Sequence, residues 1–268
     1  MMKKVITIVF LNLIAITATS QVMGVSASKL AAMNGETATR NQVEFEPGFG
    51  YFWANKYYDS NGNLEVYDPN KDSTAVFQAM AFRITYGISD RFETGILIAS
   101  DMSSFSLGMK YNLLKKGGFS TAVMGGVTFA NESDIVAVNT GIFGKTASIA
   151  IGIAGTQDFS EKLSLDFDLQ YQNVRDNNNS YSNDIFANAE FGYRFKNRNQ
   201  IIGGFSYTVN NHTHQYDGHT NQLLTFNVGG TISSGENFEI VVFTPVAIYG
   251  KNYDRLNGVN FALTIFIN

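Results

Sequence analysis

Ionisable side chains recur at every second position of several segments. Leu163–Tyr171 is the clearest, because one set of alternate residues is apolar and the other, which includes Asp166 and Asp168, is polar. Carboxylates in such a row can bind cations, pair with bases or accept hydrogen bonds. The same polar face in other segments completes a set of seven acids and three bases: Glu44, Glu46, Arg83, Glu93, Lys110, Asp166, Asp168, Glu190, Arg194 and Glu239.

These ten residues have two compatible interpretations. Buried charges away from water must be paired, so the set can form an internal network of ion pairs and hydrogen bonds. Where water is continuous, the excess of carboxylates favours the passage of cations. We favour the network and retain the passage as an alternative.

The three histidines, His212, His214 and His219, fall in one expected loop. Imidazoles that converge on a loop can bind zinc or copper, and this makes them weak metal candidates. The chain has no cysteine, and the spacing matches no familiar metal motif. A solvated polar loop is therefore the favoured interpretation, and no cofactor is expected.

The sequence contains no motif that predicts an enzyme. It contains neither a Gly-x-Ser-x-Gly nucleophile turn nor a His-Glu-x-x-His zinc pair. Without Lys3 and Lys4, 17 basic residues face 23 acidic ones, which gives a net charge of −6. No basic cluster remains, so nucleic-acid binding is not expected.

Period-two alternation predicts an all-β fold, a transmembrane antiparallel up-and-down β-barrel of about twelve strands. Short polar turns alternate with mostly longer connections rich in Asn, Asp, Tyr and Gly, as in outer-membrane barrels. We therefore expect the protein in the cell outer membrane of a Gram-negative bacterium. The expected strands are 42–54, 75–86, 92–100, 104–113, 119–130, 146–157, 163–174, 184–195, 201–209, 223–232, 238–249 and 259–268.

Aromatic residues on the apolar face indicate which face meets lipid. Tyr86 and Tyr111 lie beside short turns, whereas Trp53 and Tyr171 lie beside loops. Two such girdles are typical of membrane barrels. A soluble lipocalin-like barrel with an apolar interior is the alternative, and its aromatics would concentrate in the middle of the strands.

Three segments are expected along the chain. Residues 1–20 resemble a cleavable signal peptide, with a basic start and a short apolar run. Residues 21–41 are expected to form a periplasmic segment, disordered or with a short helix near Ser28–Met33, and a plug inside the barrel is the alternative. Residues 42–268 form the barrel.

The stretch Tyr86-Gly87-Ile88-Ser89-Asp90-Arg91-Phe92-Glu93-Thr94-Gly95 resembles a turn motif of the outer-membrane transporter family named for the meta-pathway of phenol degradation. Asp158–Asp166 is similar in style. The resemblance implies an outer-membrane barrel that passes small, hydrophobic or aromatic molecules, and it transfers no binding residues.

These observations favour a channel or transporter for small solutes. The alternatives are a non-conducting structural or accessory subunit, with a protein partner in an outer-membrane complex, and a binding module built on the loops. Outer-membrane lipid and the outer-membrane insertion machinery are the expected partners. The alternating Phe261, Leu263, Ile265 and Ile267 resemble the assembly signal of such barrels, although the chain ends in Asn268 instead of an aromatic residue.

The connection lengths predict that the short turns and both ends of the barrel face the periplasm. An epitope tag inserted at 175–183 should therefore be labelled on intact cells, whereas a tag at 196–200 should not. Labelling of the second tag alone would reverse the orientation.

Overall fold

The computed structural model describes residues 22–26, 30–67, 74–130, 146–175, 181–196, 198–213 and 219–268. The expected signal segment, 1–20, lies outside the described residues. No helix in the described part of the chain is long and apolar enough to cross a membrane.

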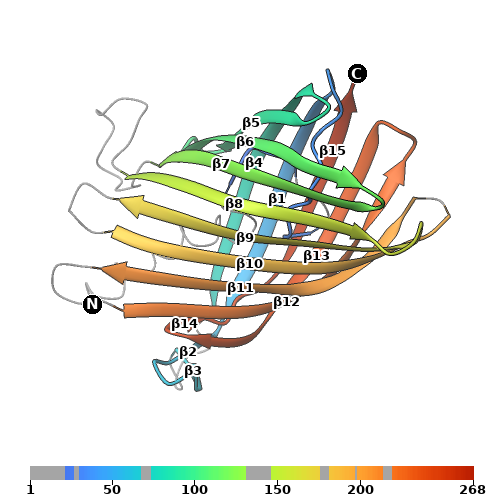
Figure 1. Ribbon diagram of the computed structural model, residues 1–268. Coiled ribbons are helices and arrows are strands. Elements are labelled where there is room, and N and C mark those ends of the chain that lie inside the picture. Colours follow the sequence, from blue (N-terminus) through green and yellow to red (C-terminus); the bar gives the residue numbers. More distant parts are fainter. Residues whose placement is uncertain are drawn as a thin grey trace.

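Twelve antiparallel strands close into a barrel, and consecutive barrel strands are neighbours throughout (Figure 1). The ring closes where the first strand pairs with the last, for example Val43 with Ile267. The barrel strands are β1 (Val43–Ala54), β4 (Ala75–Ser89), β5 (Phe92–Ala99), β6 (Ser104–Lys116), β7 (Phe119–Ala130), β8 (Thr146–Asp158), β9 (Leu163–Arg175), β10 (Tyr181–Arg194), β11 (Gln200–Thr213), β12 (His219–Ser234), β13 (Phe238–Lys251) and β15 (Asn257–Ile267).

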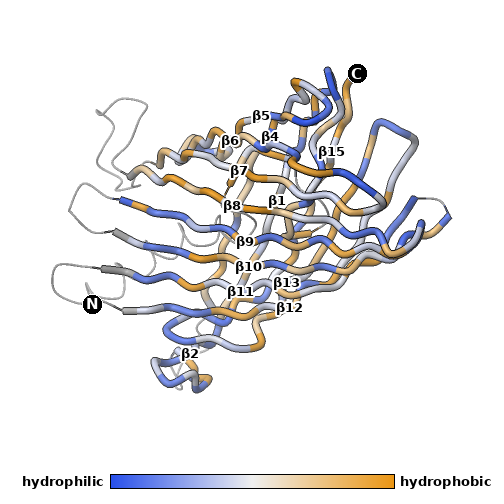
Figure 2. The backbone as a smooth tube through the Cα atoms, in the orientation of Figure 1, coloured by the Kyte–Doolittle hydropathy of each residue, from blue (hydrophilic) through white to orange (hydrophobic). Residues whose placement is uncertain are grey.

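The all-β, twelve-strand barrel expected from the sequence is confirmed. Apolar and polar residues alternate along the strands (Figure 2), and the exposed set is the apolar one. Ile149, Ile151 and Ile153 are 63%, 59% and 55% exposed, while Asp166 and Glu190 on neighbouring strands are fully buried. An apolar outside around a polar inside is the arrangement of a barrel in lipid, opposite to that of a lipocalin.

Three short strands form a separate small sheet beside the long-loop end of the barrel. β2 (Lys56–Tyr58) pairs with β3 (Leu64–Val66) and with β14 (Tyr253–Asp254). The Tyr58 hydroxyl donates to the carbonyl of Ala247 in β13 at 3.2 Å, and Tyr67 donates to the Asp254 carboxylate. The sequence did not predict this sheet, because segments of two or three residues are too short to show a period.

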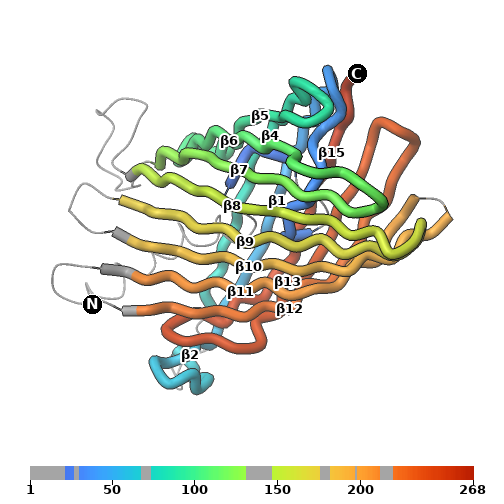
Figure 3. Tube along the Cα trace, in the orientation of Figure 1, coloured from blue at the N-terminus to red at the C-terminus, as the bar shows by residue number. Residues whose placement is uncertain are grey.

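Residues 22–26 and 30–38 lie inside the barrel (Figure 3). Val22, Val25 and Ala32 are at most 1% exposed, and residues 30–33 are irregular chain with no helical turn. The short helix expected near Ser28–Met33 is therefore absent from residues 30–33, while residues 27–29 lie outside the described part of the chain, and the buried position is that of the alternative, a plug inside the barrel. These residues find their hydrogen-bond partners on the barrel wall, and this removes the need for a helix to satisfy the backbone.

The segment leaves the lumen at the short-turn end. Arg40 forms a parallel bridge with Gly87, and the Asn41 amide donates to the carbonyl of Gly87 at 2.7 Å. Asn41 has a φ of 63°, a left-handed conformation that asparagine adopts more readily than most residues. This turn redirects the chain from the lumen into β1.

Candidate functional site

The N-terminal segment runs along the inner surface of the barrel wall in two stretches. We call residues 22–26 the first arm and residues 30–39 the second arm. The first arm runs over inward-facing small residues in register on neighbouring strands, namely Gly95, Gly108, Gly126 and Ala150. A Cβ atom on Gly95 would lie 2.0 Å from the carbonyl oxygen of Gly24, and one on Gly108 would lie 2.1 Å from that of Met23. The glycines are therefore required for this close approach.

Wall side chains satisfy the backbone of the first arm. Gln170 accepts a hydrogen bond from the Val22 amide at 2.9 Å, and Thr85 donates to the carbonyl of Gly24 at 2.8 Å. Arg83 donates to the carbonyl of Val25 at 2.9 Å. Polar groups from β9 and β4 thus hold the two ends of this arm.

Buried carboxylates hold the second arm by its backbone amides. Glu190 accepts from Leu30 and Ala31 at 3.0 and 2.9 Å, and Asp168 accepts from Met33 at 2.7 Å. Hydrogen bonds to charged acceptors are stronger than those between neutral groups, contributing roughly 1.5–3 kcal/mol each. The acids of β9 and β10 therefore receive donors from the segment itself.

Lys110 joins the two arms. Its ammonium lies 3.3 Å from a Glu93 carboxylate oxygen, and both side chains are fully buried. It also donates to the carbonyl of Ser26 at 2.9 Å and to Oδ1 of Asn34 at 2.9 Å. Glu93 in turn accepts from the Ser26 amide at 2.8 Å and from the Ala38 amide. Breaking a buried pair of this kind typically costs about 3–5 kcal/mol.

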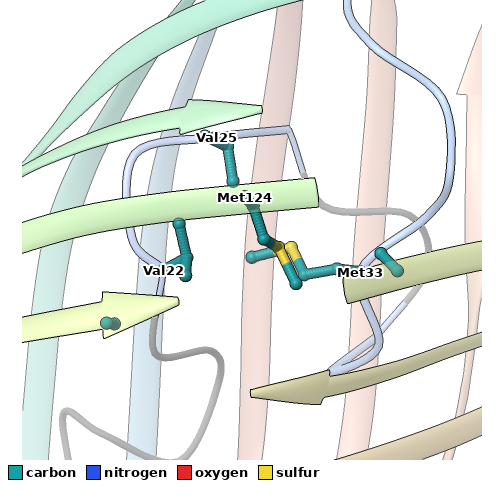
Figure 4. Packing of buried hydrophobic residues seen from close by; sticks show 6 residues of the cluster. Val22, Val25, Met33 and Met124 are labelled. Atoms are coloured by element: carbon teal, nitrogen blue, oxygen red, sulfur yellow. The ribbon is translucent and has the colours of Figure 1, made fainter. Parts of the chain in front are cut away.

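An apolar contact completes the docking of the segment. Val22, Val25 and Met33 pack against Met124 of β7, with Ala150 and Ala154 in the same cluster (Figure 4). Val22 and Val25 belong to the first arm and Met33 belongs to the second. The cluster therefore holds the two arms together and against the wall.

The opposite side of the lumen contains a cavity of about 210 Å³ between the segment and the wall formed by β13, β15, β1 and β4. We call it the inner cavity. Its apolar lining comes from Leu30 and Met33 of the segment and from inward residues such as Val241, Phe243 and Ala262. Small residues, including Gly48, Gly50 and Ala81, provide the space. Its polar lining is Glu44, Glu46, Arg83, Glu239, Asn260 and Thr264.

A second cavity of about 260 Å³, the outer cavity, lies at the short-turn end. Its lining includes Arg194, Arg198, Gln200 and Glu236, and it shares Glu239 and Phe266 with the inner cavity. The two cavities are thus neighbours along the lumen, with Glu239 and Phe266 between them.

Apolar residues pack beside the inner cavity towards the long loops. Phe52, which lines the cavity, packs with Phe77, Leu256 and the partly buried Tyr67 and Tyr253. Burial raises the pKa of the neighbouring Asp254 carboxyl, and the hydrogen bond from Tyr67 opposes that shift. The small sheet and this cluster form an apolar cap over that part of the lumen.

Residues 70–248 match the model of a family described as a membrane-bound β-barrel domain, DUF5777. The chain belongs to this family. The match spans more than half of the chain and all but the first and last strands of the barrel. No curated protein sequence matches the chain.

A solved outer membrane channel shares the fold, and two further solved structures are less similar. The COG4313 outer membrane channel from Pseudomonas putida F1 superposes with a TM-score of 0.67 at 11% identity, covering 87% of this chain and 97% of that one. The KdgM porin in complex with disordered oligogalacturonate gives 0.48 at 10% identity, covering 85% and 99%. OmpT of Vibrio cholerae gives 0.46 at 8% identity, covering 87% and 100%. The resemblance to the phenol-pathway transporters is not confirmed by these comparisons.

The structure divides the ten expected lumen residues into two groups. Glu93, Lys110, Asp168 and Glu190 contact the N-terminal segment, and Asp166 is buried beside them. Glu44, Glu46, Arg83 and Glu239 line the inner cavity, with the Arg83 guanidinium 2.7 Å from Glu46. Arg194 lines the outer cavity. The expected network therefore contains the N-terminal segment as well as side chains.

The expected histidine loop is partly corrected. His212 ends up in β11 and His219 in β12, where they are paired in register, and His214 lies outside the described residues. The strands extend beyond the expected ends at 209 and 223, because a barrel strand continues past the lipid wherever its neighbour still pairs with it. Among the residues that the structure describes, no group of His, Asp or Glu forms a metal-binding cluster.

Sequence reasoning missed the inward glycines and the apolar lining of the inner cavity. Gly95 and Gly108 lie on the polar face of their strands among charged neighbours. Glycine at such positions indicates that another stretch of backbone approaches the wall closely. After Glu239, Val241 and Phe243 alternate with the apolar Ile240 and Val242, so this part of the strand shows no difference between its two faces.

Replacing Glu190 by Ala should weaken the docking of the second arm. Loss of a charged acceptor for two amides should raise the hydrogen-exchange rates of Leu30 and Ala31 by about tenfold or more. Exchange measured by mass spectrometry on the purified barrel tests this, with the exposed Glu161→Ala as the matched control. Equal protection in both variants would show that Glu190 does not hold the segment.

Proposed function

We propose that this protein is an outer-membrane channel for small solutes with an apolar body, and that solutes pass between the N-terminal segment and the β13–β15–β1–β4 wall. The single observation that carries the proposal is the inner cavity, which is left open between the segment and this wall although Leu30 packs against Val241 and Phe243 at its edge. Of the charged residues that were the first candidates for the passage, Glu93, Lys110, Asp168 and Glu190 instead bind the segment.

The size and lining of the inner cavity support this class of solute. A volume of about 210 Å³ is of the order of the roughly 150 Å³ engineered cavity that accommodates benzene. Val241, Phe243 and Leu30 offer an apolar surface, and Glu239 and Thr264 provide a few polar groups. This composition is typical of sites for small organic molecules.

The family description and the fold shared with an outer membrane channel are consistent with a transport role. In the channel hypothesis the N-terminal segment narrows the barrel and forms one wall of the pathway. In the accessory-subunit alternative, the segment and the cap close the lumen completely. The two hypotheses differ in whether solutes cross the native barrel.

Aromatic ions provide a suitable test, because a lipid bilayer alone passes them slowly. Vesicles that contain the native barrel should release benzyltrimethylammonium or benzenesulfonate faster than vesicles without protein. Ala262→Trp, which fills the inner cavity, should slow this release by about tenfold, given a typical overpacking cost of 1–3 kcal/mol. Ala262 lines the cavity and packs beside Leu30 and Val241.

The matched control is Leu263→Trp, the next residue of the same strand, which lies on the opposite face. It should leave release unchanged, and β-structure measured by circular dichroism should be equal in all three proteins. Release that is equally fast from Ala262→Trp would place the pathway elsewhere. No release of either ion from the native barrel would reject the channel and favour the accessory role.

A further inference from the structure

The polar groups of the inner cavity have a marked charge imbalance. Three carboxylates, Glu44, Glu46 and Glu239, face the single guanidinium of Arg83. Arg83 is engaged by Glu46 at 2.7 Å and by the carbonyl of Val25 at 2.9 Å. Its distance to the nearest Glu44 oxygen is 3.9 Å. Glu46 is therefore paired closely with Arg83, Glu44 is the more distant partner of the same guanidinium, and Glu239 forms no ion pair within the described part of the chain.

Glu239 lies where the two cavities adjoin. It lines both of them, together with the aromatic ring of Phe266. It accepts a hydrogen bond from the hydroxyl of Ser233, at 3.2 Å. A carboxylate beside an aromatic ring attracts organic cations, through charge and through the negative face of the ring.

A further acceptor points to the same chemistry. Oε1 of Gln200, which lines the outer cavity, is buried and has no hydrogen-bond partner among the described residues. The arginines near the outer cavity do not reverse the excess of carboxylates over bases. Arg198 lies 3.5 Å from Glu236, and its side chain is 61% exposed. Arg194 is also exposed at the short-turn end.

From this geometry we infer that the inner cavity selects amphipathic organic cations, with the charged head near Glu44 and Glu239 and the apolar body against Val241 and Phe243. The inference rests on the proposed channel function and adds the charge of the solute. Phe52 and the apolar cap receive the end of the solute that carries no charge. An anion of equal size would meet three carboxylates and the single guanidinium of Arg83.

The test compares two ions with the same ring and opposite charge. In vesicles that contain the native barrel, benzyltrimethylammonium should leave faster than benzenesulfonate by about tenfold, the order expected for one unpaired charge close to the pathway. In the double variant Glu44→Gln with Glu239→Gln the ratio should fall towards one. The shape of both side chains is kept, and the pairing of Arg83 with Glu46 is untouched.

Glu161→Gln is the matched control, because it removes one carboxylate from an exposed turn at the same end of the barrel and should preserve the ratio. Equal release of the two ions from the native barrel would overturn the inference and leave the channel intact. A native preference that survives in the double variant would also overturn it, since the selectivity would then come from other groups. Release of neither ion would reject the channel, and the inference with it.

Discussion

The interior of this barrel depends on how its buried carboxylates are satisfied. Glu93 and Glu190 are fully buried in a wall whose outer face is apolar, and among the described residues Lys110 is the one buried lysine beside the acids on that side. Backbone amides of the N-terminal segment supply the missing donors. Because each amide has a fixed position along the chain, satisfying the acids also fixes the path of the segment. The charges of the lumen thus act first as a docking surface for the protein's own chain.

This arrangement divides the lumen into two unlike halves. The wall from β4 to β10 contacts the segment through its glycines, its carboxylates and side-chain amides such as that of Gln170. The wall formed by β13, β15, β1 and β4 presents small and apolar residues such as Ala262 and Val241 to the inner cavity. Arg83 stands at the border, since it binds both the carbonyl of Val25 and the carboxylate of Glu46. The passage that we propose follows from the space that the segment does not occupy.

The barrel could be predicted from the sequence because two unlike environments leave a two-residue period along a strand. Leu163–Tyr171 shows this well, and the predicted strand at 119–130 agrees with β7. The path of the N-terminal segment could not be predicted in the same way. Its partners at Glu190 and Asp168 accept from backbone amides, which every residue except proline has, so no side chain of Leu30, Ala31 or Met33 reveals the contact. The inner cavity was missed because apolar residues line it from a part of a strand that is apolar on both faces.

The docking of the second arm joins residues that are far apart in the sequence. The contact between Leu30 and Glu190 spans 160 residues, and that between Met33 and Asp168 spans 135. The segment is synthesised before any barrel strand, yet its acceptors exist only once β9 and β10 are in place. Contacts between residues so far apart in the sequence form slowly, because a long loop must close before the contact can stabilise the fold. Biogenesis must therefore keep the N-terminal segment apart from the growing sheet until most strands are paired, and insertion of the segment is expected among the final steps of folding.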